Sequence, residues 1–351
     1  MPEYVHGGDV YSYAEAYGGA PLDLSANINP FGIPEAVKQA MHDAVEDCTR
    51  YPDPFCRAAR RAIGAAEGVD PDWLYCGNGA ADVLDRLAAV LRPKTALLTA
   101  PTFAEYERTL AGAALRVHLL REDEGFAVTE RILLDITPEI DAVYLCNPNN
   151  PTGRTIEPQL LHRVVEKCAQ NDIWLIVDEC FNDFLTDGAR HTLKARLADY
   201  PKLVILRAYT KMYAVPGVRF GWCMTSNTDL IEGLYRAGQP WNVSVIAQAC
   251  AAAAGEAEYA AQTAARIAQE RAYLTEELTR RGLTVYPGEA NFLLFRSADS
   301  GLRDKLAACG VLIRSCANYR GLGAGYYRTA VKTREDTTRL LAALDSIQEG
   351  Y

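Results

Sequence analysis

Between residues 73 and 225, short apolar and β-branched runs alternate with longer segments of helical periodicity. This alternation is typical of βαβ units, in which helices cover a parallel sheet. Several of the runs are continuously apolar, as in strands that are buried on both faces. One of the helical patterns spans residues 157–170, and Asn171 follows it as a stop. We therefore expect an α/β domain with strands at residues 95–100, 115–120, 141–146, 173–178, 203–208 and 219–225.

The chain after residue 243 predicts a second, smaller domain. Residues 244–281 are rich in Ala, Glu and Arg, with Gly255 as a breaker, and predict a long helix or a helix pair. Strand-like runs and a closing helical pattern follow, and they indicate an α+β domain that the N-terminal segment completes. We place the domain boundaries at residues 1–48 (N-terminal arm and part of the small domain), 49–243 (large domain) and 244–351 (small C-terminal domain).

Charge and composition exclude several classes of partner. The formal net charge of -9 and the lack of a Lys/Arg cluster argue against a surface for nucleic acid or acidic lipid. The sequence has no leader pattern and no run of about 18 apolar residues, so we expect a cytoplasmic protein with no membrane partner. The ten cysteines form no CxxC pair, and we expect neither a disulfide framework nor a metal site.

Two polar motifs follow directly after expected strands. Asp178 ends the strand at 173–178, and ligands of open α/β sheets bind at the carboxyl ends of strands. Taken alone, an aspartate at such a position more commonly caps a following helix. The segment "CNPNNPTG" (146–153) places Asn149 and Asn150 between two prolines, where their amides can donate and accept hydrogen bonds. The alternative for this segment is an ordinary turn.

Two further motifs predict an anion site and a reactive amine. The segment "YCGNGAADVLDRL" (75–87) is a glycine-rich bend that opens a helix, where backbone N–H groups bind phosphate unless the bend is a plain turn. Lys211 lies in the otherwise apolar "RAYTKMYAVPGVRFGW", before Arg219. Burial there would lower the pKa of Lys211 and make its amine nucleophilic, whereas an ordinary loop lysine would face solvent. In chain order the four motifs match what pyridoxal 5'-phosphate needs: a phosphate clamp, a ring contact, a pyridinium partner and an imine lysine.

The motifs "NPNNPTG", "DE" and "YTKMYAVPGVRFGW" resemble those of the fold-type I pyridoxal-phosphate enzymes, the class I/II aminotransferase superfamily, over essentially the full chain. The resemblance implies a large cofactor-binding domain with a mixed, mostly parallel sheet and a smaller α+β C-terminal domain. It makes Lys211 the lysine that holds the cofactor, Asp178 the pyridinium partner, and Asn149 or Asn150 the ring contact. We favour Asn150, which immediately precedes the second proline. The implied phosphate contacts are Thr210, Arg219 and the backbone of Asn78, Gly79 and Ala80.

The resemblance also assigns roles to aromatic residues. Phe103 matches the residue that stacks on the cofactor ring, with Tyr106 close by. Tyr51 matches a tyrosine that reaches the cofactor phosphate of the neighbouring subunit, which implies a homodimer with shared active sites. Phe181 departs from the pattern, because many relatives have a tyrosine there that bonds to the ring hydroxyl.

Within the superfamily the chain is similar to the histidinol-phosphate aminotransferases and closer to the threonine-phosphate decarboxylases. The segments "HGGD" (6–9), "SANINPFG" (25–32) and "LIRSCANYRGLGAGYYR" (312–328) carry this resemblance. It assigns the substrate carboxylate to Arg328, in keeping with the planar fork of a guanidinium. The substrate phosphate is left to His6, Arg314 or Lys332, and the further expected substrate contacts are Asn27 and Asn150.

The reaction implied by this resemblance is decarboxylation of O-phospho-L-threonine to (R)-1-aminopropan-2-yl phosphate in cobalamin biosynthesis. A histidinol-phosphate aminotransferase is the alternative, because the outcome depends on which bond at the substrate Cα is broken. A non-catalytic cofactor-binding domain of a transcription regulator ranks behind both, since the chain begins in the enzyme-like arm. An NAD-dependent Rossmann enzyme is disfavoured, because the GxG lacks GxGxxG spacing.

Overall fold

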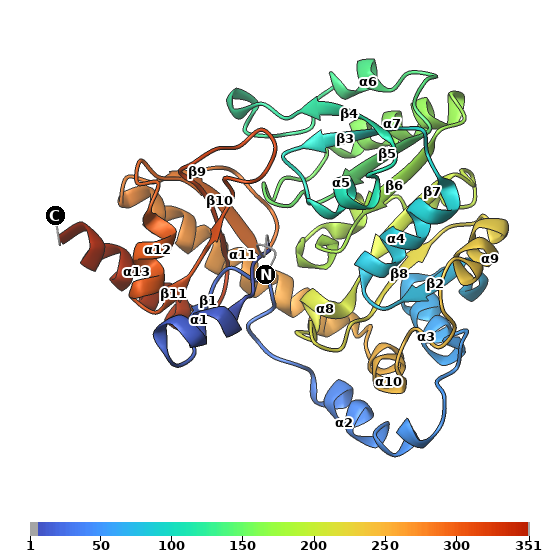
Figure 1. The fold of residues 1–351 in the computed structure, drawn as a ribbon, viewed down its shortest axis with the longest axis horizontal. Coiled ribbons are helices and arrows are strands. Elements are labelled where there is room, and N and C mark those ends of the chain that lie inside the picture. The colour runs from blue at the N-terminus through green and yellow to red at the C-terminus, as the bar shows by residue number, and fades with distance from the viewer. Residues whose placement is uncertain (1–5, 350–351) are drawn as a thin grey trace.

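The predicted βαβ segment forms a seven-stranded sheet in the computed structural model, which describes residues 6–349 (Figure 1). Its strands are β2 (Leu74–Gly77), β3 (Thr95–Ala100), β4 (Ala114–Leu119), β5 (Ala142–Cys146), β6 (Trp174–Asp178), β7 (Leu203–Arg207) and β8 (Gly221–Met224), in the order β2-β8-β7-β6-β5-β3-β4. Strands β3 to β7 pair in parallel, and β8 runs antiparallel to both of its neighbours. The expectation of a mixed, mostly parallel sheet is confirmed. Strand β2 was not expected, because its short apolar run merges with the glycine-rich bend that follows it.

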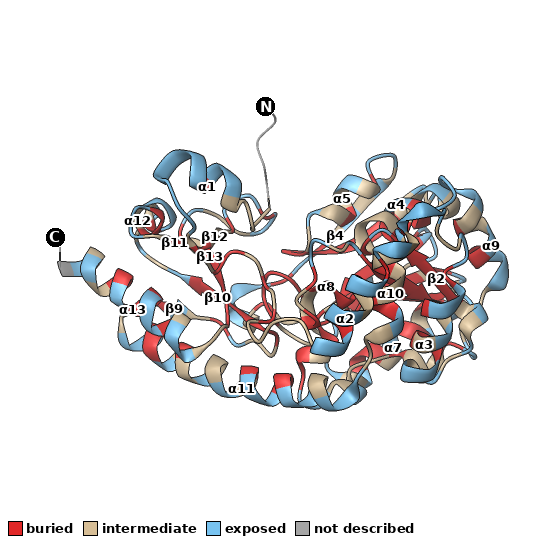
Figure 2. Ribbon diagram, turned by 90° about the horizontal axis from the view of Figure 1, so that it is seen from below, coloured by how far each residue is buried: buried red, intermediate tan, exposed pale blue. Residues whose placement is uncertain are grey.

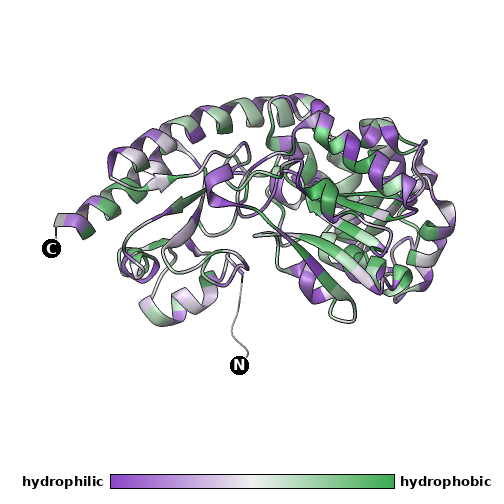
Figure 3. Ribbon diagram, turned by 90° about the horizontal axis from the view of Figure 1, so that it is seen from above, coloured by the Kyte–Doolittle hydropathy of each residue, from purple (hydrophilic) through white to green (hydrophobic). Residues whose placement is uncertain are grey.

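Helices cover both faces of this sheet. Successive side chains of each strand point to opposite faces, so the apolar strands place hydrophobic side chains on both faces, and each face has to be covered. On one face Leu98 and Tyr144 pack in a cluster with residues of α4 (Ala80–Leu91), α5 (Glu105–Thr109) and α9 (Thr228–Arg236). On the other face Leu97 and Val143 pack in a cluster with residues of α3 (Arg57–Glu67), α7 (Pro158–Gln170) and α10 (Val245–Ala253). Figures 2 and 3 show the central strands as a buried, apolar layer between helices whose outer faces are exposed and polar, whereas the edge strand β4 is largely exposed or half-buried. Helix α7 confirms the helical pattern at residues 157–170.

The C-terminal part of the chain forms a second, antiparallel sheet. Its strands are β12 (Arg314–Ser315), β13 (Tyr326–Ala330), β10 (Phe292–Arg296) and β9 (Thr284–Val285), in that order. Strand β1 (Leu22–Asp23), from the N-terminal segment, pairs in parallel with β11 (Val311–Leu312). The helices of this part are α1 (Val10–Tyr17), α11 (Ala257–Arg280), α12 (Leu302–Ala308) and α13 (Arg334–Glu349). Residues 244–281 are thus a helix pair, α10 and α11, with Gly255 at φ +102° between them.

The remaining elements are short connections. They are the helices α2 (Glu35–Asp43), α6 (Ile132–Asp135) and α8 (Tyr209–Met212). The described part of the chain also contains six 3₁₀ turns: Glu46–Thr49, Pro71–Trp73, Glu122–Glu124, Asn182–Phe184, Gly188–Arg190 and Lys194–Arg196. No helix among residues 6–349 is long and apolar enough to cross a membrane. The first five residues of the predicted N-terminal arm lie outside the described residues.

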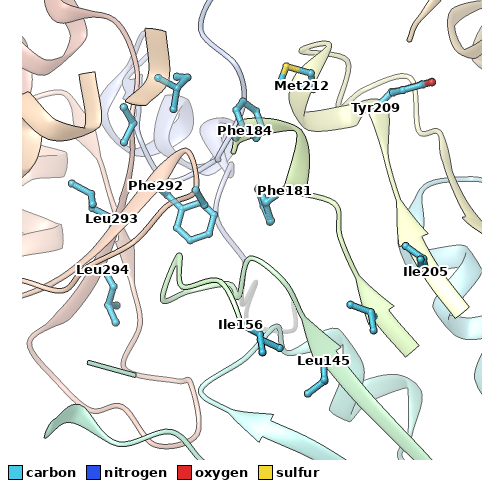
Figure 4. Packing of buried hydrophobic residues seen from close by; sticks show 14 of the residues in the cluster. Leu145, Ile156, Phe181, Phe184, Ile205, Tyr209, Met212, Phe292, Leu293 and Leu294 are labelled. Atoms are coloured by element: carbon cyan, nitrogen blue, oxygen red, sulfur yellow. The ribbon is translucent and has the colours of Figure 1, made fainter. Parts of the chain in front are cut away.

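One hydrophobic cluster is continuous between the two sheets. Phe181, in the loop after β6, meets Phe292 of β10 edge to face, with ring centroids 5.0 Å apart (Figure 4). Leu145 of β5 and Leu294 of β10 belong to the same cluster. This packing holds the C-terminal sheet beside the carboxyl ends of β5, β6 and β7, where the predicted ligand-binding residues lie.

Candidate active site

A cavity of about 410 Å³ lies at the carboxyl ends of the central strands and is lined by residues of both domains. Segments that lie far apart in the sequence contribute the residues that line this cavity, so the site exists only in the folded chain. Twelve of the predicted site residues line this cavity: His6, Asn27, Ala80, Phe103, Asn150, Asp178, Phe181, Thr210, Lys211, Arg219, Arg314 and Arg328. Four do not: Tyr51, Asn78, Gly79 and Lys332.

Lys211 projects from α8, a short helix that begins two residues after β7 ends. Its backbone carbonyl accepts a hydrogen bond from the backbone N–H of Asn29 (3.1 Å), which fixes the segment. The pKa of the Lys211 ammonium is lowered to about 8, mainly by burial and also by the positive charges of Arg328 and Arg219, while Cys180 and Asp178 act in the opposite direction. A substantial fraction of this amine is therefore neutral near pH 8 and able to act as a nucleophile.

Asp178 is the last residue of β6 and is 6% exposed. Its Oδ1 accepts a hydrogen bond from the Cys180 backbone (2.9 Å), and its Oδ2 accepts one from the Tyr106 hydroxyl (2.7 Å). Both of these donors are neutral and do not cancel the charge of the carboxylate, which can therefore act on a cationic group in the cavity that Asp178 lines. Such an environment suits the nitrogen of a protonated pyridine ring.

An anion-binding corner forms where α4 begins. Ala80 is the first residue of this helix and lines the cavity, and Gly79 before it has φ +84°. Arg219 lies against this bend, since a Cβ on Gly79 would stand 2.4 Å from Arg219 Nη2. Thr210 adds a buried hydroxyl to the cavity wall. The positive end of the helix dipole and a guanidinium together favour a phosphate. Two of the three predicted backbone donors are already used within the protein, since the Asn78 N–H donates to Asp82 Oδ2 (3.1 Å) and the Gly79 N–H to the Gly77 carbonyl (2.8 Å).

The structure separates the two asparagines of the "NPNNPTG" motif. The Asn149 amide is used within the protein, donating to the Pro101 carbonyl (3.0 Å) and to Thr152 (2.9 Å) and accepting from Thr102 (2.8 Å). Asn150 instead lines the cavity. This placement agrees with the choice of Asn150 over Asn149 as the ring contact.

Arg328 and Asn27 line the cavity, and each has buried polar atoms without a partner in the protein. Arg328 is 5% exposed, donates to Asn150 Oδ1 and to the Ser25 carbonyl (2.7 Å), and keeps a buried Nε without a partner. Both amide atoms of Asn27 are also buried without a partner. Buried polar groups are normally hydrogen-bonded, so the wall of the cavity retains hydrogen-bonding capacity that the protein itself does not use.

His6 and Arg314 reach the same cavity from the N-terminal segment and from β12. His6 Nε2 lies 2.9 Å from Glu105 Oε1, and its ring centroid is 6.0 Å from that of Phe103. Arg314 donates to Asn318 Oδ1 (2.9 Å). Lys332, just after β13, does not line the cavity, so the structure brings two of the three candidate phosphate ligands to it.

Tyr51 lies on the surface, 76% exposed, and stacks on Trp241 with centroids 4.5 Å apart. It does not line the cavity of its own chain. Phe181 lines the cavity, and its ring has no hydroxyl group that could form a hydrogen bond to a ligand.

Several cavity residues were not identified from the sequence, among them Glu105, Cys146, Cys180 and Tyr319. The two thiols flank Asp178, and burial together with the Asp178 charge raises the pKa of Cys180, so it stays a neutral thiol. All ten cysteines are free, and no cluster of metal-binding side chains occurs in the described part of the chain. The nearest sequence signal for these residues was their position beside motifs that had been identified.

Comparison with known proteins agrees with this geometry. The family model "Aminotransferase class I and II" matches residues 20–344. The chain is 38% identical to the threonine-phosphate decarboxylase of Salmonella typhimurium, covering 98% of this chain and 97% of the relative. It is 28% identical to the adenosylcobalamin biosynthesis bifunctional protein CobDQ of Leptospira interrogans, over 100% of this chain and 41% of that protein.

Among solved structures, the histidinol-phosphate aminotransferase of Clostridium acetobutylicum superposes with a TM-score of 0.87 at 28% identity, covering 93% of this chain and 99% of that one. The family match spans both domains and includes the lysine, aspartate and arginine that line the cavity. The chain therefore belongs to the class I and II aminotransferase family of fold-type I, pyridoxal-phosphate-dependent enzymes.

Proposed function

We propose that this protein decarboxylates O-phospho-L-threonine to (R)-1-aminopropan-2-yl phosphate, a step of cobalamin biosynthesis in the cytoplasm. The observation that carries the proposal is the presence of two arginines, Arg314 and Arg328, on the wall of the cavity that holds Lys211. A substrate with both a phosphate and a carboxylate matches two separate guanidinium groups. The full-length similarity to the Salmonella decarboxylase supports this choice.

The residues around the cavity fit pyridoxal 5'-phosphate. We expect Lys211 to hold its aldehyde carbon, Asp178 to face its ring nitrogen and Phe103 to stack on the ring. Thr210, Arg219 and the start of α4 would hold its phosphate. When bound, this cofactor supplies an electron sink for the charge that develops at the substrate Cα.

The remaining residues orient the substrate and move protons. Arg328 would hold the carboxylate, and His6 and Arg314 would hold the phosphate. Lys211, whose pKa is lowered to about 8, can carry a proton near neutral pH and deliver it to Cα after CO₂ has left. Which bond breaks depends on how Arg328 and Asn150 orient the carboxylate, and Arg328 already donates to Asn150.

A histidinol-phosphate aminotransferase is the second candidate, favoured by the close superposition with the Clostridium enzyme. The two activities differ in their need for a 2-oxo acid. The experiment is therefore to give the cofactor-loaded protein O-phospho-L-threonine, O-phospho-L-serine and histidinol phosphate, each with and without 2-oxoglutarate. Turnover of phosphothreonine without 2-oxoglutarate is expected, and turnover of histidinol phosphate that requires it would contradict the proposal.

We further propose a homodimer in which Tyr51 completes the active site of the other subunit. Tyr51, Phe55 and Trp241 are 76%, 41% and 46% exposed. Trp241 stacks on Tyr51 and lines the same surface hollow as Phe55, and none of the three rings lines the active-site cavity. Exposed aromatic groups of this kind are typical of protein interfaces. The expected homodimer would bury these rings.

A further inference from the structure

Tyr106 contacts two predicted cofactor residues, Asp178 and Phe103. It lies on α5 and is 1% exposed. Its hydroxyl donates to Asp178 Oδ2 (2.7 Å), and its ring meets Phe103 edge to face with centroids 5.7 Å apart. Tyr106 does not line the cavity, so any effect on a ligand acts through these neighbours.

The hydrogen bond from Tyr106 leaves the charge of Asp178 uncancelled. Both donors to this carboxylate, the Tyr106 hydroxyl and the Cys180 backbone, are neutral. Burial, with the negative charge of Asp178, raises the pKa of the Tyr106 hydroxyl well above its ordinary value. The hydroxyl therefore stays protonated and donates throughout the usual pH range.

We propose that Tyr106 is a positioning residue that holds the Asp178 carboxylate toward the ring nitrogen of pyridoxal phosphate. The inference rests on the proposed cofactor. Without the hydroxyl, Oδ2 loses its donor within the protein, and the carboxylate is both less stabilised as an anion and freer to turn. Hydrogen bonds to charged groups are among the stronger ones in proteins, so their loss is measurable.

Tyr144 offers a matched control. It is 1% exposed, its ring centroid is 6.1 Å from that of Tyr106, and its hydroxyl is buried without a partner. Tyr106→Phe and Tyr144→Phe thus remove the same atom from neighbouring buried rings, but one variant breaks a hydrogen bond and the other breaks none.

The experiment titrates the cofactor-free protein and both variants with pyridoxal phosphate, and then follows the absorption of the bound cofactor against pH. Tyr106→Phe is expected to weaken binding about tenfold or more and to move the absorption titration by about one pH unit. Tyr144→Phe should change the affinity by less than about twofold and the midpoint of the absorption titration by less than a few tenths of a pH unit. Thermal unfolding of the cofactor-free proteins checks that each variant folds.

Wild-type affinity and an unchanged titration in Tyr106→Phe would overturn the inference, as would equal losses in both variants. A second measurement places Tyr106→Phe in an Asp178→Asn background. There it should weaken binding less than about twofold, because the carboxylate that it positions is absent. An additive loss would show that Tyr106 acts independently of Asp178. A wild-type protein that binds no pyridoxal phosphate would instead contradict the proposed function itself.

Discussion

Lys211 combines a reactive group with surroundings that favour its neutral form. Because burial lowers the pKa to about 8, the amine of the cofactor-free protein gains reactivity as pH rises through that value and levels off above it. The rate of modification by a small amine-directed reagent, followed at this residue by mass spectrometry, should therefore have its midpoint near pH 8. A midpoint near that of free lysine, about 10.4, would contradict this environment. The Lys211→Ala variant, which lacks this amine, is the control for modification at other residues.

Arg328 differs from a simple positive charge because it donates through two Nη atoms and keeps a third donor unpaired. Arg328→Lys keeps the charge but loses the fork, so kcat/KM for phosphothreonine should fall by about 10- to 100-fold. Arg320→Lys is the matched control, since Arg320 forms a two-pronged pair with Glu107 (2.9 Å each) outside the cavity lining. Equal kinetics in the two variants would count against a carboxylate at Arg328.

At this scale the sequence predicts residues within compact motifs better than contacts between them. Lys211 and Asp178 were identified because each stands beside a recognisable strand or motif. The bond between Tyr106 and Asp178 joins positions 72 apart, and the pair of His6 with Glu105 joins positions 99 apart. Such contacts depend on how the elements pack, which no local pattern encodes.

The start of α4 is the element whose geometry is most constrained. Gly79→Ala would place a Cβ 2.4 Å from Arg219 Nη2 and would force alanine to φ +84°. We expect Arg219 to be displaced and the affinity for pyridoxal phosphate to fall about tenfold or more, with a strain of about 1 to 2 kcal/mol. Titration of the cofactor-free protein measures the affinity.

Gly112→Ala is the control for this substitution. No heavy atom lies within 4 Å of the added Cβ there, and the backbone does not require positive φ. Normal affinity in Gly79→Ala would show that the bend is not part of the phosphate site.

Among the elements, long periodic segments were predicted well, and short ones were not. Strand β3 matches its expected range of 95–100, and α7 begins one residue after the expected start. Strand β2 was missed because its four residues end in the glycine that also opens the bend before α4. Strand β8 was expected, but its antiparallel direction follows from chain topology and not from its apolar pattern.

For the whole molecule, the central question is whether two chains share each active site. If Tyr51 contributes to the active site of the partner subunit, a mixed dimer of a Tyr51→Ala subunit and a Lys211→Ala subunit contains one active site with neither substitution. Activity should then appear on mixing and refolding the two variants together, up to about a quarter of the wild-type value for random pairing. No gain over the separate variants would mean that Tyr51 acts within its own chain.

The domain arrangement follows from packing between distant segments. The Phe181–Phe292 contact and the pairing of β1 with β11 bring residues of the N-terminal segment, β6 and β13 to one cavity. The sequence predicted that an N-terminal segment would join the C-terminal part, but the position of Lys332 outside the cavity depends on the path of the chain after β13.

The fate of the substrate carboxyl carbon tests the proposed function most directly. O-phospho-L-threonine labelled with ¹³C at the carboxyl carbon can be incubated with the cofactor-loaded protein, without a 2-oxo acid, and followed by NMR. We predict that the label leaves as CO₂ and bicarbonate, in equal amount to the aminopropanol phosphate formed. Label that stays in the organic product, or that moves only when a 2-oxo acid is added, would contradict a decarboxylase.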